Sequence, residues 1–253
     1  MDSGAASLVD SAPAIAWEGG YAHVVWERSG GYIRYRRRQD TGTWDGVISI
    51  VGPEPDYPPG NPDVVAGAGR VFVVWDWRIF SYVAYSEYSL VYSRSEVTGS
   101  VSFSAPREVG TDKTGWWEYY YSTYNVDSLP DRDEYLLDLQ PSIALNEAGW
   151  PAVVWHVDRS GGNHTDYAIY YSYALTGTGT GVNWITPTLL SRDQPTMRGS
   201  AVIGVGEPEA GGEQHLHVAY MQKLSATAWD VYYDSNEQDR YPHVYMPLVM
   251  RAN

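Results

Sequence analysis

The feature of this sequence that most restricts its fold is an internal repeat of two short apolar strands joined by a tight turn. Three copies begin at a proline and end on a tryptophan, and a weaker fourth copy ends on a tyrosine. The copies span residues 13–26, 62–75, 141–155 and 201–220. Repetition over several tens of residues is typical of folds built from one supersecondary unit used many times.

Each copy continues into a third apolar strand, and these third strands align on Ile33, Val91, Ile169 and Val231. In the first unit we expect four strands, at 14–17, 21–27, 32–36 and 47–50. The expected strands of the other units lie at 62–66, 71–75, 90–94 and 103–109; at 141–145, 151–155, 168–172 and 185–190; and at 201–205, 217–220, 230–234 and 243–246. No long segment has a sustained helical period, so helices should be short or absent.

The second strand of each unit is apolar on both faces, which predicts a β-propeller of about four four-stranded antiparallel blades. A β-sandwich would show cleaner alternation along most strands. We expect a single domain over 1–253, with blades at 12–52, 61–110, 140–191 and 199–250 and an inserted loop at 111–139. Four large aromatic residues that end the second strands should pack between blades. They are Trp26, Trp75, Trp155 and Tyr220.

Two alternatives concern completion of the ring. The chain could be part of a larger propeller, or it could assemble into one by self-association. Residues 7–10 have the pattern of an outer strand whose unit lies elsewhere, and residues 244–249 compete for the same place. The sequence leaves these alternatives open.

The blade pattern Pro-x-[Ile/Val]-Ala, Val-Val-Trp, Ile-x-Tyr and Trp resembles that of the sialidase-like, Asp-box (BNR) propellers, over nearly the whole chain. That family carries Ser-x-Asp-x-Gly-x-x-Trp in the turn between the third and fourth strands. Here the first unit has Asp40-Thr-Gly-Thr-Trp44, one residue short, and the third unit keeps Gly181-Val-Asn-Trp184. The resemblance implies a propeller in which these boxes are structural turns away from the catalytic face.

Composition excludes several classes of function. A net charge of −14 argues against binding to nucleic acid, which favours a basic face. The absence of cysteine excludes disulfides and thiolate metal sites. No apolar run is long enough to span a membrane. We expect an extracellular or cell-surface protein, although residues 1–6 lack the basic and apolar parts of a signal peptide.

Long connections should gather on one face of the propeller. In a four-stranded blade, the connections between the second and third strands share a face with those between consecutive blades. The long segments 76–89, 111–140, 156–167 and 221–229 all belong to these two classes. Variable loops on a rigid scaffold commonly carry function, so we expect the ligand on this face.

The segment 111–134 is the main candidate for ligand contact, because aromatic residues in a long loop could form a platform for sugar rings or for a peptide. The alternative is that these aromatics cap the channel or pack on their own blade. The predicted ligand-binding residues are Trp116, Trp117, Tyr119, Tyr120, Tyr121 and Tyr124, helped by Trp77 and Arg78. The predicted partner is therefore a carbohydrate or a protein or peptide.

Charged clusters give two further candidates. The acidic residues of 127–138 could bind a hard cation such as Ca²⁺, with Asp131 and Asp133 as ligands, although acidic loops are commonly just solvated. We predict no other cofactor. The basic side chains Arg34, Arg36 and Arg38 share one face of a strand and could hold an anion, while a solvated or acid-paired strand is the alternative.

Enzymatic chemistry has no clear motif in the sequence. Sialidases of the resembled superfamily use an arginine triad, a Tyr/Glu nucleophile pair and an aspartic acid, but their Arg-Ile-Pro signature is absent here, so no residue is assigned as catalytic. We therefore expect a non-catalytic binding or scaffold module. The alternative is a glycoside hydrolase that uses two carboxylates from the loops.

Overall fold

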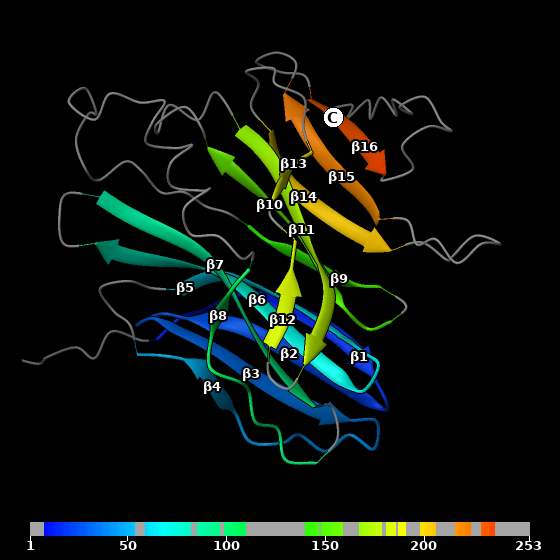
Figure 1. The fold of residues 1–253 in the computed structure, drawn as a ribbon. Helices are drawn as coiled ribbons and strands as arrows, with labels where there is room; N and C mark the ends of the chain where they lie inside the picture. The colour runs from blue at the N-terminus through cyan, green and yellow to red at the C-terminus, as the bar shows by residue number, and fades with distance from the viewer. Residues whose placement is uncertain are drawn as a thin grey trace, which may run out of the picture. The chain divides into compact units, whose positions relative to one another are not determined.

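The computed structural model describes 8–53, 59–81, 85–96, 99–109, 140–146, 148–158, 167–178, 181–185, 187–190, 198–205, 216–223 and 229–235. Throughout these ranges the chain forms strands, turns and extended segments, and no helix occurs in them (Figure 1). The predicted all-β class is confirmed. The chain divides into two compact units, Met1–Glu108 and Val109–Asn253, which are described separately below.

The first unit contains two four-stranded antiparallel sheets, each in sequential order. The first sheet is β1 (Asp10–Glu18), β2 (Tyr21–Arg28), β3 (Tyr32–Gln39) and β4 (Ile48–Val51). The second is β5 (Pro59–Gly67), β6 (Arg70–Ser81), β7 (Tyr85–Glu96) and β8 (Arg107–Glu108). Between β2 and β3, Gly30 and Gly31 adopt φ values of 90° and 79°, as the predicted hairpin turn requires.

The second unit repeats the same order of strands. One sheet has the order β12-β11-β10-β9, with β13 also paired to β11, and the other has the order β14-β15-β16. The strands are β9 (Ser142–Leu145), β10 (Pro151–Asp158), β11 (Tyr167–Thr178), β12 (Gly181–Trp184), β13 (Thr188–Leu189), β14 (Arg198–Val205), β15 (Leu216–Lys223) and β16 (Trp229–Ser235). The repeat seen in the sequence is therefore a repeat of sheets.

Each unit has a core between its sheets. In the first unit, Val25, Ile33 and Tyr35 of the first sheet pack against the second sheet through Val73 and Trp75. In the second unit, the corresponding cluster is formed by Val154, Ile169, Ala201, Val218 and Tyr220. The second strand of a unit contributes on both faces, since five consecutive residues of β6, from 71 to 75, are fully buried.

Consecutive antiparallel sheets whose second strands are buried on both faces are the blades of a β-propeller, so the predicted fold class is confirmed. Trp75 and Trp155 have no exposed surface and Tyr220 is 7% exposed, in agreement with the predicted packing. Trp26 differs, because it is only half-buried.

In three segments the structure differs from the prediction. The described part of 7–10 is no separate outer strand, because Asp10 begins β1 and pairs with Arg28, where β2 continues past the expected end. The strands that flank 76–89 are longer than expected, since β6 and β7 stay paired as far as Ser81 and Tyr85. Residues 181–184 form β12 instead of a turn.

In three blades the backbone is irregular at, or just before, the start of the first strand. The residue before the proline has a positive φ in each case, 45° at Ala12, 48° at Asn61 and 38° at Gln140. The strand pairing shifts register at the first two of these places. Positive φ is uncommon outside glycine, and such residues gather at functional sites. The bulges therefore direct attention to the ends of the strands around them.

Candidate functional site

Two carboxylates from neighbouring blades converge on the bulge in β5. Glu27 follows Trp26 near the end of β2, and Asp76 follows Trp75 on β6, so the two acids occupy the same place in the repeat. Glu27 lies near the end of β2, whereas Asp76 lies in the middle of β6, which continues to Ser81. The two side chains approach the same backbone segment, residues 60–61.

Asn61 joins the two acids. Its backbone N–H donates to Oε2 of Glu27 over 3.4 Å, and its side-chain Nδ2 donates to Oδ2 of Asp76 over 2.8 Å. The hydroxyl of Ser11 donates to the other oxygen of Glu27, Oε1, over 2.5 Å. Asparagine tolerates the left-handed conformation better than most residues, which explains why it can occupy this bulge.

The two acids are close to each other. A Cβ added to Gly60 would lie 3.1 Å from Oδ1 of Asp76 and 3.5 Å from Oε2 of Glu27. The two oxygens are therefore closer than the total of these distances, so the carboxylates are near neighbours. Asp76 is 7% exposed, whereas Glu27 is half-buried, so one acid is withdrawn from solvent and the other is reachable.

A third carboxylate nearby, that of Asp10, has a structural role. Its Oδ1 accepts hydrogen bonds from Nε of Arg28 at 2.7 Å and from the indole of Trp26 at 3.1 Å, and its Oδ2 accepts from Arg28 at 3.1 Å. The hydrogen bonds from Arg28 hold the pKa of Asp10 below its ordinary value. The exposed ion pair between Asp10 and Arg28 links the start of β1 to the end of β2.

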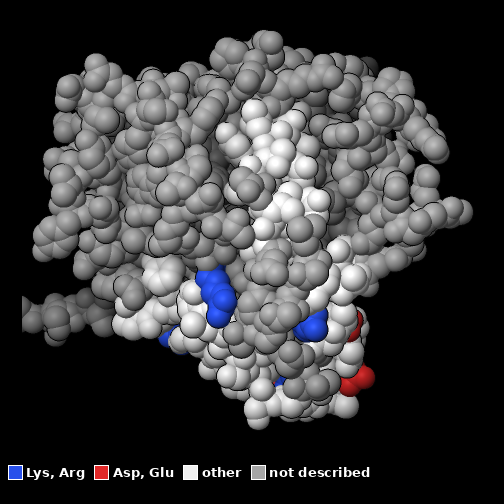
Figure 2. All heavy atoms as spheres, in the orientation of Figure 1, with Lys and Arg blue, Asp and Glu red and all other residues white. Residues whose placement is uncertain are grey.

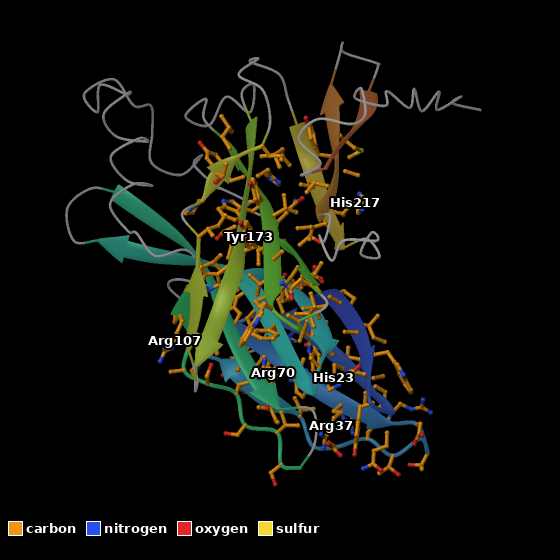
Figure 3. The ribbon with its side chains drawn as sticks, turned by 45° about the vertical axis from the view of Figure 1, so that its right-hand side comes forward. His23, Arg37, Arg70, Arg107, Tyr173 and His217 are labelled. Carbon is orange, nitrogen blue, oxygen red and sulfur yellow. The ribbon has the colours of Figure 1, made fainter. Side chains whose placement is uncertain are left out.

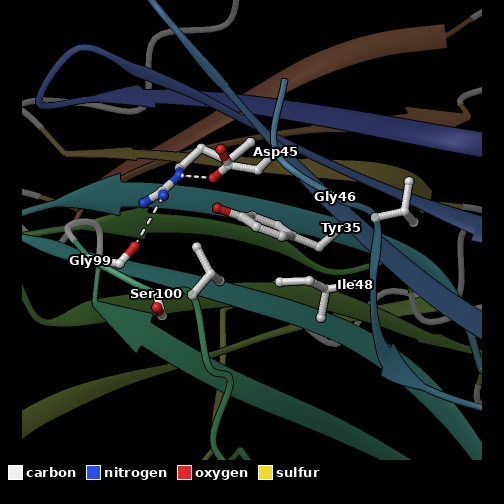
Figure 4. Close-up of a pocket in the computed structure, with 9 residues that line it drawn as sticks. Tyr35, Asp45, Gly46, Ile48, Gly99 and Ser100 are labelled. Atoms are coloured by element: carbon white, nitrogen blue, oxygen red, sulfur yellow. Dashed lines mark hydrogen bonds and ion pairs between the residues drawn. The ribbon is translucent and has the colours of Figure 1, made fainter. Parts of the chain in front are cut away.

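A hollow of about 350 Å³ lies in the first unit beside Tyr35 and Arg37, between the segments 45–48 and 99–101 (Figure 4). Nε of Arg37 donates to Oδ2 of Asp45 at 2.7 Å, and the same guanidinium donates to the carbonyl of Gly99 at 3.1 Å. These segments connect third and fourth strands, the class of turn that the resemblance assigns a structural role. The buried guanidinium of Arg37 therefore links these two turns.

Tyr35, which lines this hollow, forms a buried pair with His23. Nδ1 of His23 lies 2.6 Å from the tyrosine hydroxyl oxygen. Burial, reinforced by the charge of Arg37, lowers the pKa of His23 to about 4. Burial also raises the pKa of Tyr35. Both side chains are therefore neutral at physiological pH, and both are buried in the first unit. His23 is labelled in Figure 3.

The predicted ligand contacts mostly lie outside the described residues. This holds for Trp116, Trp117, Tyr119, Tyr120, Tyr121 and Tyr124, and for Asp131 and Asp133. Trp77 lies on β6, where it is half-buried and packs against the core of the first unit, and Arg78 is the next residue of the same strand. Within the described ranges, no three metal-binding side chains cluster together.

The predicted shared face of Arg34, Arg36 and Arg38 is confirmed by the pairing of β3 with β2. The guanidinium of Arg34 lies 4.3 Å from the ring centre of Tyr32, and those of Arg36 and Arg38 lie 5.0 and 5.9 Å from that of Trp44. Basic and acidic side chains are both visible on the face drawn in Figure 2, without a continuous patch of either among the described residues.

Sequence reasoning missed Glu27 and Asp76, although a signal for them was present. The repeat reads Val-Val-Trp-Glu in the first unit and Val-Val-Trp-Asp in the second. An acid that follows the same anchor in consecutive blades is placed on the same face of both. The missing step was to carry the alignment one residue beyond the tryptophan.

The architecture defines the chain as a β-propeller protein, and comparison with known proteins agrees at the level of fold. No family model matches the sequence, and no curated protein does. Among the described residues, no helix is long and apolar enough to cross a membrane.

Solved structures with a similar fold include two enzymes. An α-L-arabinanase from Penicillium chrysogenum, complexed with arabinobiose, aligns with a TM-score of 0.55 at 14% identity, over 94% of this chain and 66% of the enzyme. A Trypanosoma rangeli sialidase, complexed with sialic acid, aligns with a TM-score of 0.53 at 11% identity, over 89% of this chain and 36% of the enzyme. The chain therefore spans between about a third and two thirds of these proteins.

A xylan β-1,4-xylosidase from Bacillus halodurans aligns less closely, with a TM-score of 0.48 at 12% identity. That alignment covers 94% of this chain and 42% of the xylosidase. At such identities the similarity concerns the fold.

Proposed function

We propose that this chain is the propeller, or part of the propeller, of a glycoside hydrolase in which Glu27 and Asp76 form the catalytic acid pair. The observation that carries the proposal is the convergence of these two carboxylates from neighbouring blades on the Gly60–Asn61 bulge. Glycoside hydrolysis commonly needs two carboxyl groups on either side of the bond that is cleaved, about 5–5.5 Å apart in retaining enzymes. The arabinanase and the sialidase with the same fold support the choice of a glycoside as substrate.

The environments of the two acids suggest their roles. Asp76 is buried and its orientation is fixed by the amide of Asn61, as a nucleophile or general base requires. Glu27 is half-buried at the end of β2 and can reach a bound glycosidic oxygen, so it serves as the proton donor. Asn61 then acts as a positioning residue that fixes the two carboxylates relative to each other.

This proposal favours the alternative from the sequence over a non-catalytic binding module. The hypothesis of a non-catalytic binding module depended on the absence of the sialidase signature. That absence does not exclude a catalytic pair of acids at other positions in the blades. The aromatic segment 111–134 stays a prediction for contacts to the sugar. An extracellular or cell-surface location, which would bring the protein to polymeric glycans, also stays a prediction.

We also propose that the turn at residues 40–44 is a shortened Asp-box. Gly42 has a φ of 95° and donates its N–H to the carbonyl of Gln39, while Trp44 pairs with Arg38. The closed turn with a glycine between an aspartate and a tryptophan supports a common origin with the sialidase-like blades. Its place between third and fourth strands separates it from the acid pair.

A panel of chromogenic arabinosides, xylosides and sialosides, together with arabinan, tests the proposed activity. We expect turnover of at least one substrate by the wild-type chain, and a loss of at least about a hundredfold in Glu27→Gln and in Asp76→Asn. Glu18→Gln is the matched control, because Glu18 is a half-buried carboxylate at the far end of β1. Thermal melting verifies that each variant folds.

Absence of turnover on every substrate would overturn the proposal. Full activity in either folded variant of the pair would overturn the assignment of that residue. Full activity in the control is required for the loss in the pair to be attributed to the site.

A further inference from the structure

The first sheet has one face packed in the core and one face turned to solvent. Strand pairing places Ile15 opposite Val24 and Val24 opposite Arg36, so these residues lie on the same side. We call this side the β1 face. Its members are Ile15, Trp17, Val24, Trp26, Arg34, Arg36 and Arg38. The opposite side carries Val25 and Tyr35 and packs on the second sheet.

The β1 face is exposed where the other blades are covered. Ile15 is 70% exposed, whereas Val64 and Ile143, at the same place in the repeat, are 5% and 6% exposed. Trp17, two residues further along β1, is 58% exposed. Because adjacent exposed apolar side chains on a sheet face mark an interaction site, the β1 face has the surface of a blade that lacks its preceding neighbour.

The last described sheet, which contains β14, is uncovered on the side that would face a following blade. Val202 of β14 pairs with Ala219 just as Ala14 of β1 pairs with Val25. Ala14 packs against the core shared with the second sheet, yet Val202 is 54% exposed. The side of a blade that normally receives the following blade is therefore open at β14.

The charges on the β1 face point to an acidic partner. Among the described residues, no carboxylate forms an ion pair with Arg34, Arg36 or Arg38. Arg34 donates to the hydroxyl of Ser49 and Arg36 to the backbone carbonyl of Asp45, and all three guanidinium groups lie near aromatic rings. The chain as a whole carries a net charge of −14, so another copy offers a surrounding field of opposite sign. A two-fold contact of the β1 face with itself would bring the arginines together, which like-charge repulsion disfavours.

We propose that the β1 face binds a second copy of this chain, through the side of the second copy's β14 sheet that exposes Val202. The contact is head-to-tail, and it repeats the packing of the second sheet on the first. A head-to-tail contact leaves one open face at each end of the pair, so assembly continues into chains or closes into rings. This interaction surface is independent of the proposed activity.

Sedimentation over a range of concentrations tests the contact. We expect the wild-type protein to form dimers and larger species, and Trp17→Asp and Val202→Asp each to weaken self-association at least about tenfold. Each variant keeps one intact face, so an equimolar mixture of the two should form a dimer that grows no further. Val47→Asp is the matched control, since Val47 is 49% exposed but lines the hollow on the opposite side of the sheet.

A wild-type protein that stays monomeric at all concentrations overturns the proposal, as does closure of the two faces within one chain, which also gives a monomer. A mixture of the two variants that forms no dimer overturns the head-to-tail arrangement. Binding of an acidic polysaccharide to a monomeric wild-type protein, abolished by Trp17→Asp, would assign the face to a glycan instead. If Trp17→Asp fails to fold by near-UV circular dichroism, Ile15→Asp takes its place.

Discussion

His23 shows how a single buried side chain makes the stability of the first unit depend on pH. Its side chain has no exposed surface and its ring nitrogen contacts the hydroxyl of Tyr35. The unfolded chain protonates this histidine below a pH of about 6.5. The folded chain keeps it neutral until the pH approaches 4. Between these values the unfolded state binds more protons, so lowering the pH favours unfolding.

We expect the free energy of unfolding of the wild-type protein to fall as the pH falls from about 6.5 to about 4, by up to about 1.4 kcal/mol per pH unit from this group. The double variant His23→Phe/Tyr35→Phe should lose that part of the pH dependence, because it removes the titrating group and the partner it would leave unpaired. Urea unfolding of both proteins across this range measures the difference. Equal slopes would show that the folded protein admits a charged His23.

At the scale of elements, the turn after β4 depends on close approach of its backbone to a neighbouring ring. Gly52 has a φ of 125°, and a Cβ there would lie 2.4 Å from Cδ1 of Tyr32 and 2.7 Å from the carbonyl of Gly31. We expect Gly52→Ala to destabilise the protein by about 2 kcal/mol or more, since both the conformation and the space exclude a side chain. Chemical denaturation measures the loss.

Gly46→Ala is the matched control for that substitution. A Cβ at Gly46 meets no atom within 4 Å. Its effect should therefore stay within about 0.5 kcal/mol, as is usual for surface positions. A loss as large as that in Gly52→Ala would mean that flexibility of the whole segment, rather than contact with Tyr32, decides the stability.

The elements of the blades could be predicted from sequence because their anchors are local. The proline and the Val-Val-Trp run located the first two strands of the first three units, and the glycines at 30 and 31 located a turn. The length of the β6–β7 hairpin could not be predicted, because residues 76–89 contain no glycine or proline that would mark the position of the turn. The acid pair was missed for a different reason: Glu27 and Asp76 are 49 positions apart in sequence and meet only through a bulge at Asn61.

At the scale of the whole molecule, the first unit has a complete core of its own. The buried cluster that includes Val25, Ile33 and Trp75 draws all its members from residues before 108. We expect a fragment of residues 1–108 to unfold cooperatively and to give a near-UV circular dichroism signal from its buried aromatic side chains. A gradual, non-cooperative melt would show that two blades alone bury too little apolar surface to fold.

The exposure of Trp17 has an optical consequence. Indole emission shifts to longer wavelength and becomes open to quenching by small solutes when water reaches the ring, and Trp17 is 58% exposed while Trp75 and Trp155 are fully shielded. Subtracting the spectrum of Trp17→Phe from that of the wild-type protein isolates the emission of this one ring. The tryptophan at the open side of the first blade is therefore a built-in fluorescent label for whatever comes to cover it.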